Sequence, residues 1–313
     1  MRVQFWGVRG SLPSPLVSFN VADKFLEIFE KLEPADLENP KNKKRFLDNL
    51  PPWLYGTVGG NTSCVSVQFG DNNEILVFDA GSGIRELGLN FGSLNPKPSQ
   101  YHLLFSHFHW DHLMGMPFFG PAYDPSVTID FYSPFSNMEK ALKDQMMPPY
   151  FPVQMDAMSS KKNFHIIHKP IELLGAKISF RKMNHPGDSY SYKVEYDKRK
   201  FIYATDTELL PEDFLKSDEN SAFFSDADLI VVDSQYTIGE AIEKYNWGHN
   251  SFSMAVDFAA NWGIKHLVLF HHDPGYDDKV LFNILQSANL YIERMKIKGL
   301  SISLAIEGME ITL

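Results

Sequence analysis

One stretch of seven residues, Ser-His-Phe-His-Trp-Asp-His at 106–112, constrains this chain more than any other. It directly follows the apolar run 101–105, which predicts a buried strand bounded upstream by Pro96 and Pro98. Three imidazoles and a carboxylate placed so close together are hard to explain as core packing. Histidine is the commonest protein metal ligand, and carboxylates join it at zinc and manganese sites. The stretch therefore predicts a metal-binding loop at the end of a strand.

The spacing within this loop favours two ions over one. His107 and His109, two residues apart on extended backbone, project to the same side and can bind a single ion. Asp111 and His112, at the start of a turn or helix, can face a second ion beside the first. One loop cannot complete two coordination shells, so further ligands must come from later in the chain.

Three later segments supply candidates, each at or just after the end of a predicted strand. They are His185 in the turn 184–187, Asp206 in 203–207, and His271 with His272 in 267–273. Neighbours on an extended strand point to opposite faces, so only one of His271 and His272 can reach the ions.

The full pattern is His-x-His-x-Asp-His followed by a distant His, Asp and His, and in this the chain resembles the metallo-β-lactamase superfamily. The short sequence motifs around these residues are similar to those of its ribonuclease Z and cyclic-phosphodiesterase branch. They are Gly59-Gly60-Asn61-Thr62-Ser63, Asp79-Ala80-Gly81, Ala204-Thr205-Asp206-Thr207 and Gly248-His249-Asn250-Ser251. The resemblance spans roughly residues 1–10, 56–132 and 170–313.

The resemblance implies an α/β fold, an αββα four-layer sandwich of two mixed β-sheets flanked by helices. It also implies two divalent ions, zinc or manganese first and iron as a third option, since the ligands offer nitrogen and oxygen but no thiolate. Carried over residue by residue, it places His107, His109 and His185 on the first ion, Asp111, His112 and His271 on the second, and Asp206 between both. It thus favours His271 over His272.

Two such ions can hold a shared water and lower its pKa from near 16 to about 7, so that a bridging hydroxide is available at neutral pH. Asp111 is placed to orient this nucleophile or take its proton. His249 resembles a loop histidine that contacts the scissile phosphate in the ribonuclease Z branch, where an imidazolium can protonate the leaving oxygen. The alternative is that His249 only starts a helix.

Four further residues are expected beside the ions rather than on them. Asp79 should support a ligand histidine, and its turn, 79–83, either presents backbone N–H groups to an anion or simply connects a strand to a helix. Asn61 and His272 are expected to support a ligand or line the substrate pocket. Trp110, between two ligands, is expected to shape the loop or the pocket.

Two insertions are expected within a single hydrolase domain that spans residues 1–313. The first, at about 16–55, has helical apolar spacing over 19–32 and a second short helix over 41–50. The second, at about 134–165, carries a helix-like piece and a proline-rich run. Each insertion is expected to be either a lid over the site or a dimer contact.

The other elements alternate short apolar strands with turns and helices. Strands are expected at the start of 1–10 and over 64–69, 74–78, 127–132, 176–181, 190–196, 200–205, 229–234, 266–270, 301–305 and 310–312, with a turn at 70–73. Helices are expected over 251–262, capped by Ser251, and over about 277–298, ended by Gly299.

The charge balance argues against a long nucleic acid as partner. The formal net charge is −10, whereas nucleic-acid binders usually carry a basic patch. The basic cluster Lys41, Lys43, Lys44 and Arg45 fits a solvated helix face. A ribonuclease Z would also need a basic, glycine- and proline-rich arm to hold transfer RNA, and no such insertion is seen.

Composition also bears on compartment. No run of about 18 apolar residues occurs, so no membrane span is expected. The single cysteine, Cys64, lies in a strand-like run and is interpreted as a small core residue. The N-terminal residues 1–7 predict an immediate strand instead of a secretory signal. These features together indicate the cytoplasm.

The leading hypothesis is a dinuclear metal-dependent phosphodiesterase that acts on a small-molecule substrate such as a cyclic nucleotide or cyclic phosphate. The alternatives are a nuclease on RNA or DNA ends, an acyl hydrolase such as a lactonase or thioesterase, and a non-catalytic metal-binding sensor. A homodimer is expected from the resemblance and from the insertion at 16–55.

Overall fold

The computed structural model describes residues 1–70, 72–94 and 97–313. Asp71, within the expected turn 70–73, and Pro96, the expected boundary of a strand, lie outside the described residues. Within the described ranges the strands form two seven-stranded mixed sheets. In hydrogen-bonded order the first is β14 (Glu310–Thr312), β1 (Arg2–Gly7), β2 (Cys64–Gln68), β3 (Glu74–Phe78), β4 (Gln100–Leu104), β5 (Thr128–Ser133) and β6 (Lys161–Ile166). The second is β13 (Ser301–Leu304), β12 (His266–Phe270), β11 (Leu229–Asp233), β10 (Arg199–Ala204), β9 (Ser189–Tyr196), β8 (Ala176–Met183) and β7 (Ile171–Leu173).

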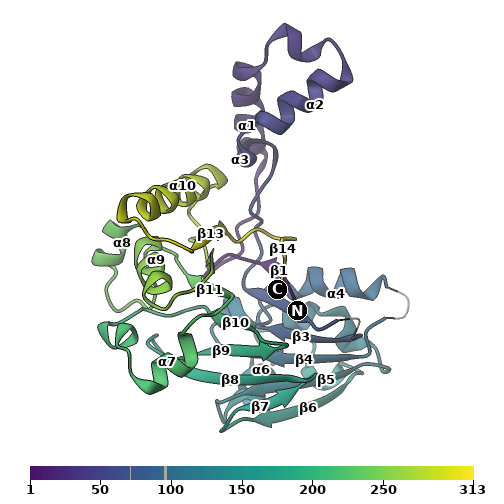
Figure 1. Ribbon diagram of the computed structural model, residues 1–313. Helices are drawn as coiled ribbons and strands as arrows, with labels where there is room; N and C mark the ends of the chain where they lie inside the picture. Colours follow the sequence, from purple (N-terminus) through teal and green to yellow (C-terminus); the bar gives the residue numbers. More distant parts are fainter. Residues whose placement is uncertain (71, 95–96) are drawn as a thin grey trace.

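Helices cover both outer faces of the paired sheets (Figure 1). Their bounds are α1 (Ser18–Lys31), α2 (Pro40–Asn49), α3 (Pro52–Tyr55), α4 (Ile84–Gly92), α5 (Trp110–Leu113), α6 (Met138–Asp144), α7 (Asp218–Phe224), α8 (Ile238–Glu243), α9 (Phe252–Asn261) and α10 (Asp278–Met295). Apolar side chains of α4 and α6 pack on the first sheet, and those of α7, α9 and α10 pack on the second. A third core lies between the sheets. The four-layer αββα sandwich expected from the sequence is confirmed.

Parallel pairing explains where polar residues collect. Strands β3, β4 and β5 run parallel in the first sheet, and β10, β11 and β12 run parallel in the second. Parallel neighbours end at the same edge of a sheet. Residues that follow β3 and β4 therefore meet at one edge, and residues that follow β10, β11 and β12 meet at the facing edge of the other sheet.

The second expected insertion, 134–165, is shorter than the sequence indicated. Residues 161–166 form β6, which pairs in parallel with β5 and extends the first sheet. Its sequence, Lys-Lys-Asn-Phe-His-Ile, alternates too weakly to reveal a strand, and lysines are typical of sheet edges. One helix boundary also differs, since α10 ends at Met295 and is capped by Lys296 in a left-handed conformation, before Gly299.

The first insertion, residues 16–55, forms an arm that stands away from the sandwich (Figure 1). It contains α1, α2 and α3, close to the two helices expected there. The arm contacts α10 of the body through α3 and through Lys24 and Glu27 of α1. Among the described residues, no helix has both the length and the apolar character needed to cross a membrane.

Candidate metal centre

The loop 106–112 begins at the carboxyl end of β4 and is anchored by its first residue. The backbone N–H and the hydroxyl of Ser106 donate to the two oxygens of Asp79, each at 2.7 Å. Asp79 follows β3, which runs parallel to β4. The chain then turns into α5, a single turn in which Asp111 and His112 are buried. The motif thus changes from extended to helical backbone at its centre.

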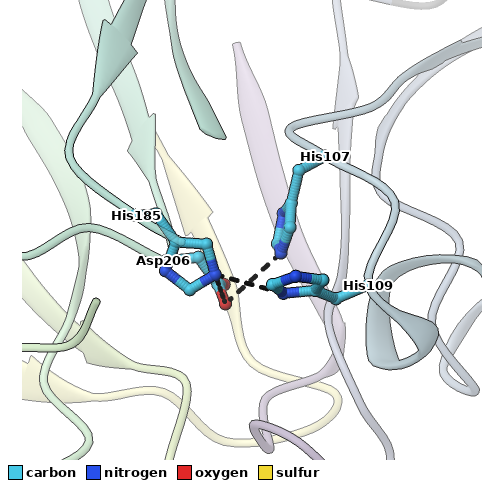
Figure 2. Close-up of side chains that lie close together, drawn as sticks. All are labelled: His107, His109, His185 and Asp206. Atoms are coloured by element: carbon cyan, nitrogen blue, oxygen red, sulfur yellow. Dashed lines mark hydrogen bonds and ion pairs between the residues drawn. The ribbon is translucent and has the colours of Figure 1, made fainter. Parts of the chain in front are cut away.

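Four side chains form a first group with one nitrogen or oxygen of each within 4.8 Å of the others: His107, His109, His185 and Asp206 (Figure 2). Nε2 of His185 lies 3.1 Å from Nδ1 of His109. Oδ1 of Asp206 lies 3.7 Å from Nε2 of His107 and 3.8 Å from Nε2 of His185. Figure 2 shows the three rings converging on the carboxylate. The structure thus gathers the residues assigned to the first ion.

A second group consists of Asp111, His112, His271 and the same Asp206. Oδ2 of Asp206 is 3.0 Å from Nε2 of His112 and 3.2 Å from Nε2 of His271. Oδ2 of Asp111 is 3.2 Å and 3.1 Å from the same two nitrogens. Asp206 therefore presents one oxygen to each group.

The electrostatics of the first group favour neutral imidazoles. Burial lowers the pKa of His107, His109 and His185 below the ordinary value for histidine. Neutral rings keep a nitrogen lone pair, which a metal ion requires. Nε2 of His107 is buried and has no hydrogen-bond partner among the described residues, and such a nitrogen is costly unless something binds it.

In the second group, carboxylates determine the charge state. Burial acts against charge on His112, but Asp206, Asp111 and Asp79 raise its pKa well above the ordinary value. Burial also opposes charge on His271, whose pKa Asp206 and Asp111 nevertheless raise to about 9. The carboxylates therefore stabilise positive charge at His112 and His271. A divalent cation would supply it in place of protons, so this donor set fits a metal ion as well as the first group does.

Three residues of the centre follow strands in left-handed backbone: Asp79, Asp206 and His271 have φ of 59°, 47° and 60°. This conformation costs a non-glycine residue on the order of 1 kcal/mol. The left-handed turn redirects each side chain out of the pleat of its strand and toward the gap between the two sheet edges. Strain of this kind commonly marks functional sites.

Asp79 lies next to the second group. Of the residues in the two groups, it forms a hydrogen bond with His112 alone. Its Oδ2 accepts hydrogen bonds from Nδ1 of His112 and from the hydroxyl of Tyr203, each at 2.9 Å. The contact leaves Nε2 of His112 facing Asp206 and fixes the ring orientation. The structure therefore places Asp79 in contact with His112, one of the residues that the resemblance assigned to the second ion.

Two glycines allow the backbone to approach the rings of two ligand candidates, His185 and His271. The carbonyl of Gly248 accepts a hydrogen bond from Nδ1 of His185 at 3.0 Å, and a Cβ on Gly248 would lie 2.2 Å from that nitrogen. A Cβ on Gly10 would lie 2.5 Å from Nδ1 of His271. The next residue, Ser11, donates its backbone N–H to Oδ2 of Asp111 at 2.7 Å. The turn after β1 therefore supports the second group.

The structure separates the neighbours His271 and His272. His271 enters the second group, whereas Nε2 of His272 donates to the carbonyl of Ala305 at 2.9 Å. Burial lowers the pKa of His272 to about 3, so this ring is a neutral buried side chain. His272 therefore links the end of β12 to the end of β13 and belongs to neither group.

His249 lies beside both groups and has a partner that sequence reasoning missed. Its Nδ1 is 2.6 Å from Oδ2 of Asp233, and its ring centre is 5.3 Å from that of His185 and 5.0 Å from that of His271. Asp233 ends β11, the strand between β10 and β12. An available signal was that 229–233, like 75–79 and 202–206, is an apolar run that ends in an aspartate.

The remaining two expected residues lie farther out. The Asn61 side chain bonds Glu307 and Ser82, which ties the loop before β2 to the end of the chain. Trp110 is 76% exposed and lines a cavity formed with Phe118 and Tyr150. Asn61 thus braces loops, and Trp110 turns its ring away from the two groups.

Comparison with known proteins places this geometry in a family. A sequence model described as a β-lactamase superfamily domain matches residues 75–272, which includes both groups. Ribonuclease Z of Prochlorococcus marinus (strain MIT 9515) is 23% identical over 299 residues, covering 77% of this chain and 91% of that protein.

Solved structures share the fold. The metallo-β-lactamase fold protein YhfI from Bacillus subtilis superimposes with a TM-score of 0.64 at 17% identity, covering 99% of this chain and 98% of that one. A diphosphatase from the PhnP family superimposes with a TM-score of 0.63 at 17% identity, covering 100% and 97%. At such identities the likeness establishes the fold.

Proposed function

Because this chain belongs to the metallo-β-lactamase superfamily, we propose that it is a dinuclear metal-dependent phosphodiesterase acting on a small diester such as a cyclic nucleotide or cyclic phosphate. The observation that carries the proposal is the orientation of Asp206, whose two oxygens face different groups of side chains. One ion would need one group, whereas two ions joined by a carboxylate use both. The whole chain, residues 1–313, acts as one hydrolase domain.

The donor atoms suit zinc or manganese, with iron as a third option. The first ion would be held by His107, His109 and His185, the second by Asp111, His112 and His271, and both by Asp206. When bound, two such ions supply a water of lowered pKa and neutralise charge on a phosphoryl group.

Asp111 is the residue proposed to orient and deprotonate the attacking water. The backbone N–H of Ser11 holds its Oδ2 in place, so the carboxylate stays beside the two groups. From this position Asp111 orients the water and accepts its proton as the oxygen bonds to phosphorus.

His249 is proposed to complete the reaction at the other side of phosphorus. Its Nδ1–H donates to Asp233, which leaves Nε2 to carry the transferable proton. As the bond from phosphorus to the leaving oxygen breaks, that oxygen keeps the electron pair and takes the proton from Nε2. The sum is one water and one diester giving one monoester and one free hydroxyl, which leaves as an alcohol from an open-chain diester and stays on the same molecule when the diester is cyclic.

Two observations support a small phosphate ester as substrate. The similar proteins include a ribonuclease and a diphosphatase, and both names denote cleavage at phosphorus. The net charge of −10 disfavours long polyanions that need counter-charge along their length. An acyl hydrolase and a metal-binding sensor remain the alternatives from other classes.

The deciding experiment is a substrate panel given to manganese- and zinc-loaded protein, with Asp111→Ala as control. The panel holds a bis-aryl phosphodiester, cyclic nucleotides, a short RNA, a lactone and a thioester. Metal-dependent cleavage of the diesters that Asp111→Ala abolishes supports the proposal. Cleavage of the acyl compounds alone would replace it with an acyl hydrolase, and no cleavage by protein that binds two ions would favour a sensor.

A nuclease on RNA ends is the second candidate, and the arm is the observation that favours it. Helix α2, on the projecting arm, carries Lys41, Lys43, Lys44 and Arg45, all exposed. A basic helix held away from the body could contact a polyanion. The discriminating measurement is RNA binding as a function of salt, because a complex with several phosphate contacts weakens steeply as salt rises. Flat, weak binding would remove this candidate.

A further inference from the structure

We infer that the substrate is an open-chain diester, not a cyclic one, and that its leaving alcohol is an aromatic group that binds in a cavity of 550 Å³ beside His249. This inference rests on the proposed function and names its substrate class more closely. The cavity is lined mainly by apolar side chains, among them Leu209, Leu210, Ile238, Ile242, Tyr245 and Met254.

The position of the cavity connects it to the reaction. His249 forms part of its wall, and the same ring lies within 5.3 Å, between centres, of His185 and His271. A phosphoryl group held at the two groups of ligands would present its leaving oxygen to His249. The group attached to that oxygen then extends into the cavity.

Two polar side chains in the wall, Glu208 and Asn250, already have hydrogen-bond partners in the protein. Glu208 accepts hydrogen bonds from the backbone of Asn246 and Gly248, each at 3.1 Å. Asn250 accepts from the backbone of Leu209 and donates to the carbonyl of Thr207. Recognition is therefore by apolar contact, and the Glu208 carboxylate repels a second anionic phosphate.

A second apolar cavity, of 520 Å³, is lined neither by His249 nor by any residue of the two groups. Its wall contains Phe108, which lies between the metal-ligand candidates His107 and His109 on extended backbone, and Trp110, the first residue of α5. Neighbouring residues on extended backbone point to opposite sides, so Phe108 points away from the side of His107 and His109. This second cavity therefore lies behind the metal loop, and it serves as the internal control.

Two substrates that differ in the leaving group test the inference. Phenyl methyl phosphate and 2-naphthyl methyl phosphate release phenols of similar acidity, but the naphthyl group has more apolar surface to bury. Burial of that surface should raise kcat/KM for the naphthyl ester at least about tenfold over the phenyl ester. Equal kcat/KM for the two esters would overturn the inference while leaving a phosphodiesterase intact.

A matched pair of variants locates the effect. Ala241 on α8 and Ala141 on α6 are both half-buried helical alanines, and each lines one of the two cavities. Ala241→Phe fills the cavity beside His249 and should abolish the naphthyl preference, whereas Ala141→Phe should keep it. The opposite pattern, or loss of the preference in both, would contradict the assignment.

A binding measurement separates failure of this inference from failure of the proposed function. The released product 2-naphthol is fluorescent, and its binding to the protein needs no turnover. Binding that Ala241→Phe weakens and Ala141→Phe preserves supports the cavity, even in a protein that cleaves no diester. Unchanged binding in Ala241→Phe would overturn it.

An independent observation concerns the arm, residues 16–55, which we propose pairs with the same arm of a second copy of this chain. Helix α1 is amphipathic, and none of its fourteen residues, all of which the structure describes, is buried. Its large apolar side chains are exposed to solvent: Phe19 at 66%, Phe25 at 54%, Leu26 at 60% and Phe29 at 62%. Isolated helices of this length are marginal in water.

Helix α1 turns its polar face toward its own protein. Lys24 donates to Asp278 at the start of α10 and, at 2.7 Å, to the carbonyl of Gly56. Glu27 pairs with Lys279 at 3.0 Å. The apolar face consequently points away from the body, and a contiguous apolar surface of this kind marks a protein interface.

Charge on the arm favours a second copy as the partner. Residues 18–38 contain six acidic and two basic side chains, whereas α2 contains four basic and one acidic. Within one arm Arg45 pairs with Asp36 at 4.0 Å, so the charges available to a second copy are the others. Two arms related by a twofold axis can set the acidic segment of each against the basic helix of the other, as an isologous interface requires. The acidic segment would be repelled by an anionic membrane.

Sedimentation velocity at micromolar concentration tests this pairing. The wild type should sediment as a dimer and Phe25→Glu as a monomer with unchanged circular dichroism, because Phe25 is exposed and its loss disturbs no core. Leu290→Glu is the matched control, since Leu290 is 52% exposed on a helix outside the arm, and it should stay dimeric. A monomeric wild type, or a dimeric Phe25→Glu, would overturn the proposal. Binding of wild type, but not of Phe25→Glu, to phosphatidylcholine–phosphatidylserine vesicles would assign the face to a membrane instead.

Discussion

Oδ2 of Asp233 lies 2.6 Å from Nδ1 of His249, so a carboxylate at the end of β11 orients the histidine that stands beside both groups of ligand candidates. Asp233 itself is fully buried. The pair therefore fixes the orientation of the imidazole beside both groups. A catalytic proton donor must be held within reach of the leaving oxygen, and this position suits His249 to the role proposed for it.

We expect Asp233→Asn to slow turnover by about 100-fold, because general acid catalysis typically contributes at least that factor. Combining it with His249→Ala should add little, since both changes disable the same step. Steady-state kinetics with metal analysis of each variant is the measurement. Loss of bound metal in Asp233→Asn would show that Asp233 is a ligand, contrary to this assignment.

Asp206→Ala should lower the content of both metal ions, because its two oxygens face both groups. The measurement is the metal-to-protein ratio after dialysis. Asp257→Ala is a suitable control, since Asp257 on α9 bonds Tyr291 far from the centre and its loss should leave the ratio unchanged. If Asp206→Ala retains one ion at full occupancy, the carboxylate serves only one group.

Asp79→Asn should weaken metal affinity by about 10- to 100-fold, the usual effect of removing a partner that orients a ligand. Asparagine keeps the size of the side chain but presents an NH₂ where Oδ2 accepts from His112 and Tyr203. Competition with a chelator gives the affinity. Tyr203→Phe, which removes a donor and leaves the His112 contact, should have the smaller effect; equal effects would argue against orientation of His112 as the cause.

Gly10→Ala should reduce activity and metal affinity together, because a Cβ at Gly10 would lie 2.5 Å from Nδ1 of His271 and must displace the ring. Gly92→Ala is the control. A Cβ there has nothing within 4 Å, and alanine within a helix stabilises it by roughly 0.5–1 kcal/mol relative to glycine. Normal activity in Gly10→Ala would mean that the turn after β1 is free to move away from His271.

Most of the fold could be predicted from local pattern. Short apolar runs bounded by glycine and proline located strands such as 74–78 and 266–270, and the capping residue Ser251 marked the start of α9. Strand β6 was not predicted from the sequence, because an edge strand buries only part of one face and its apolar alternation is weak. The arm was expected as helices, but nothing local indicated that α1 would turn its polar face inward, since that depends on Lys24 meeting Asp278 across the chain.

The sequence by itself determined the chemistry of the centre. Two features are local: the donor types in 106–112, and the strand-end positions of His185, Asp206 and His271. Each could be predicted from the adjacent residues in the sequence. Only the tertiary structure decided how these donors divide. The assignment of one Asp206 oxygen to each group, the exclusion of His272 and the partnership of Asp233 with His249 depend on parallel strands ending at facing sheet edges. They also depend on left-handed turns there, and a turn's direction is set by packing between distant segments rather than by the residue that makes it.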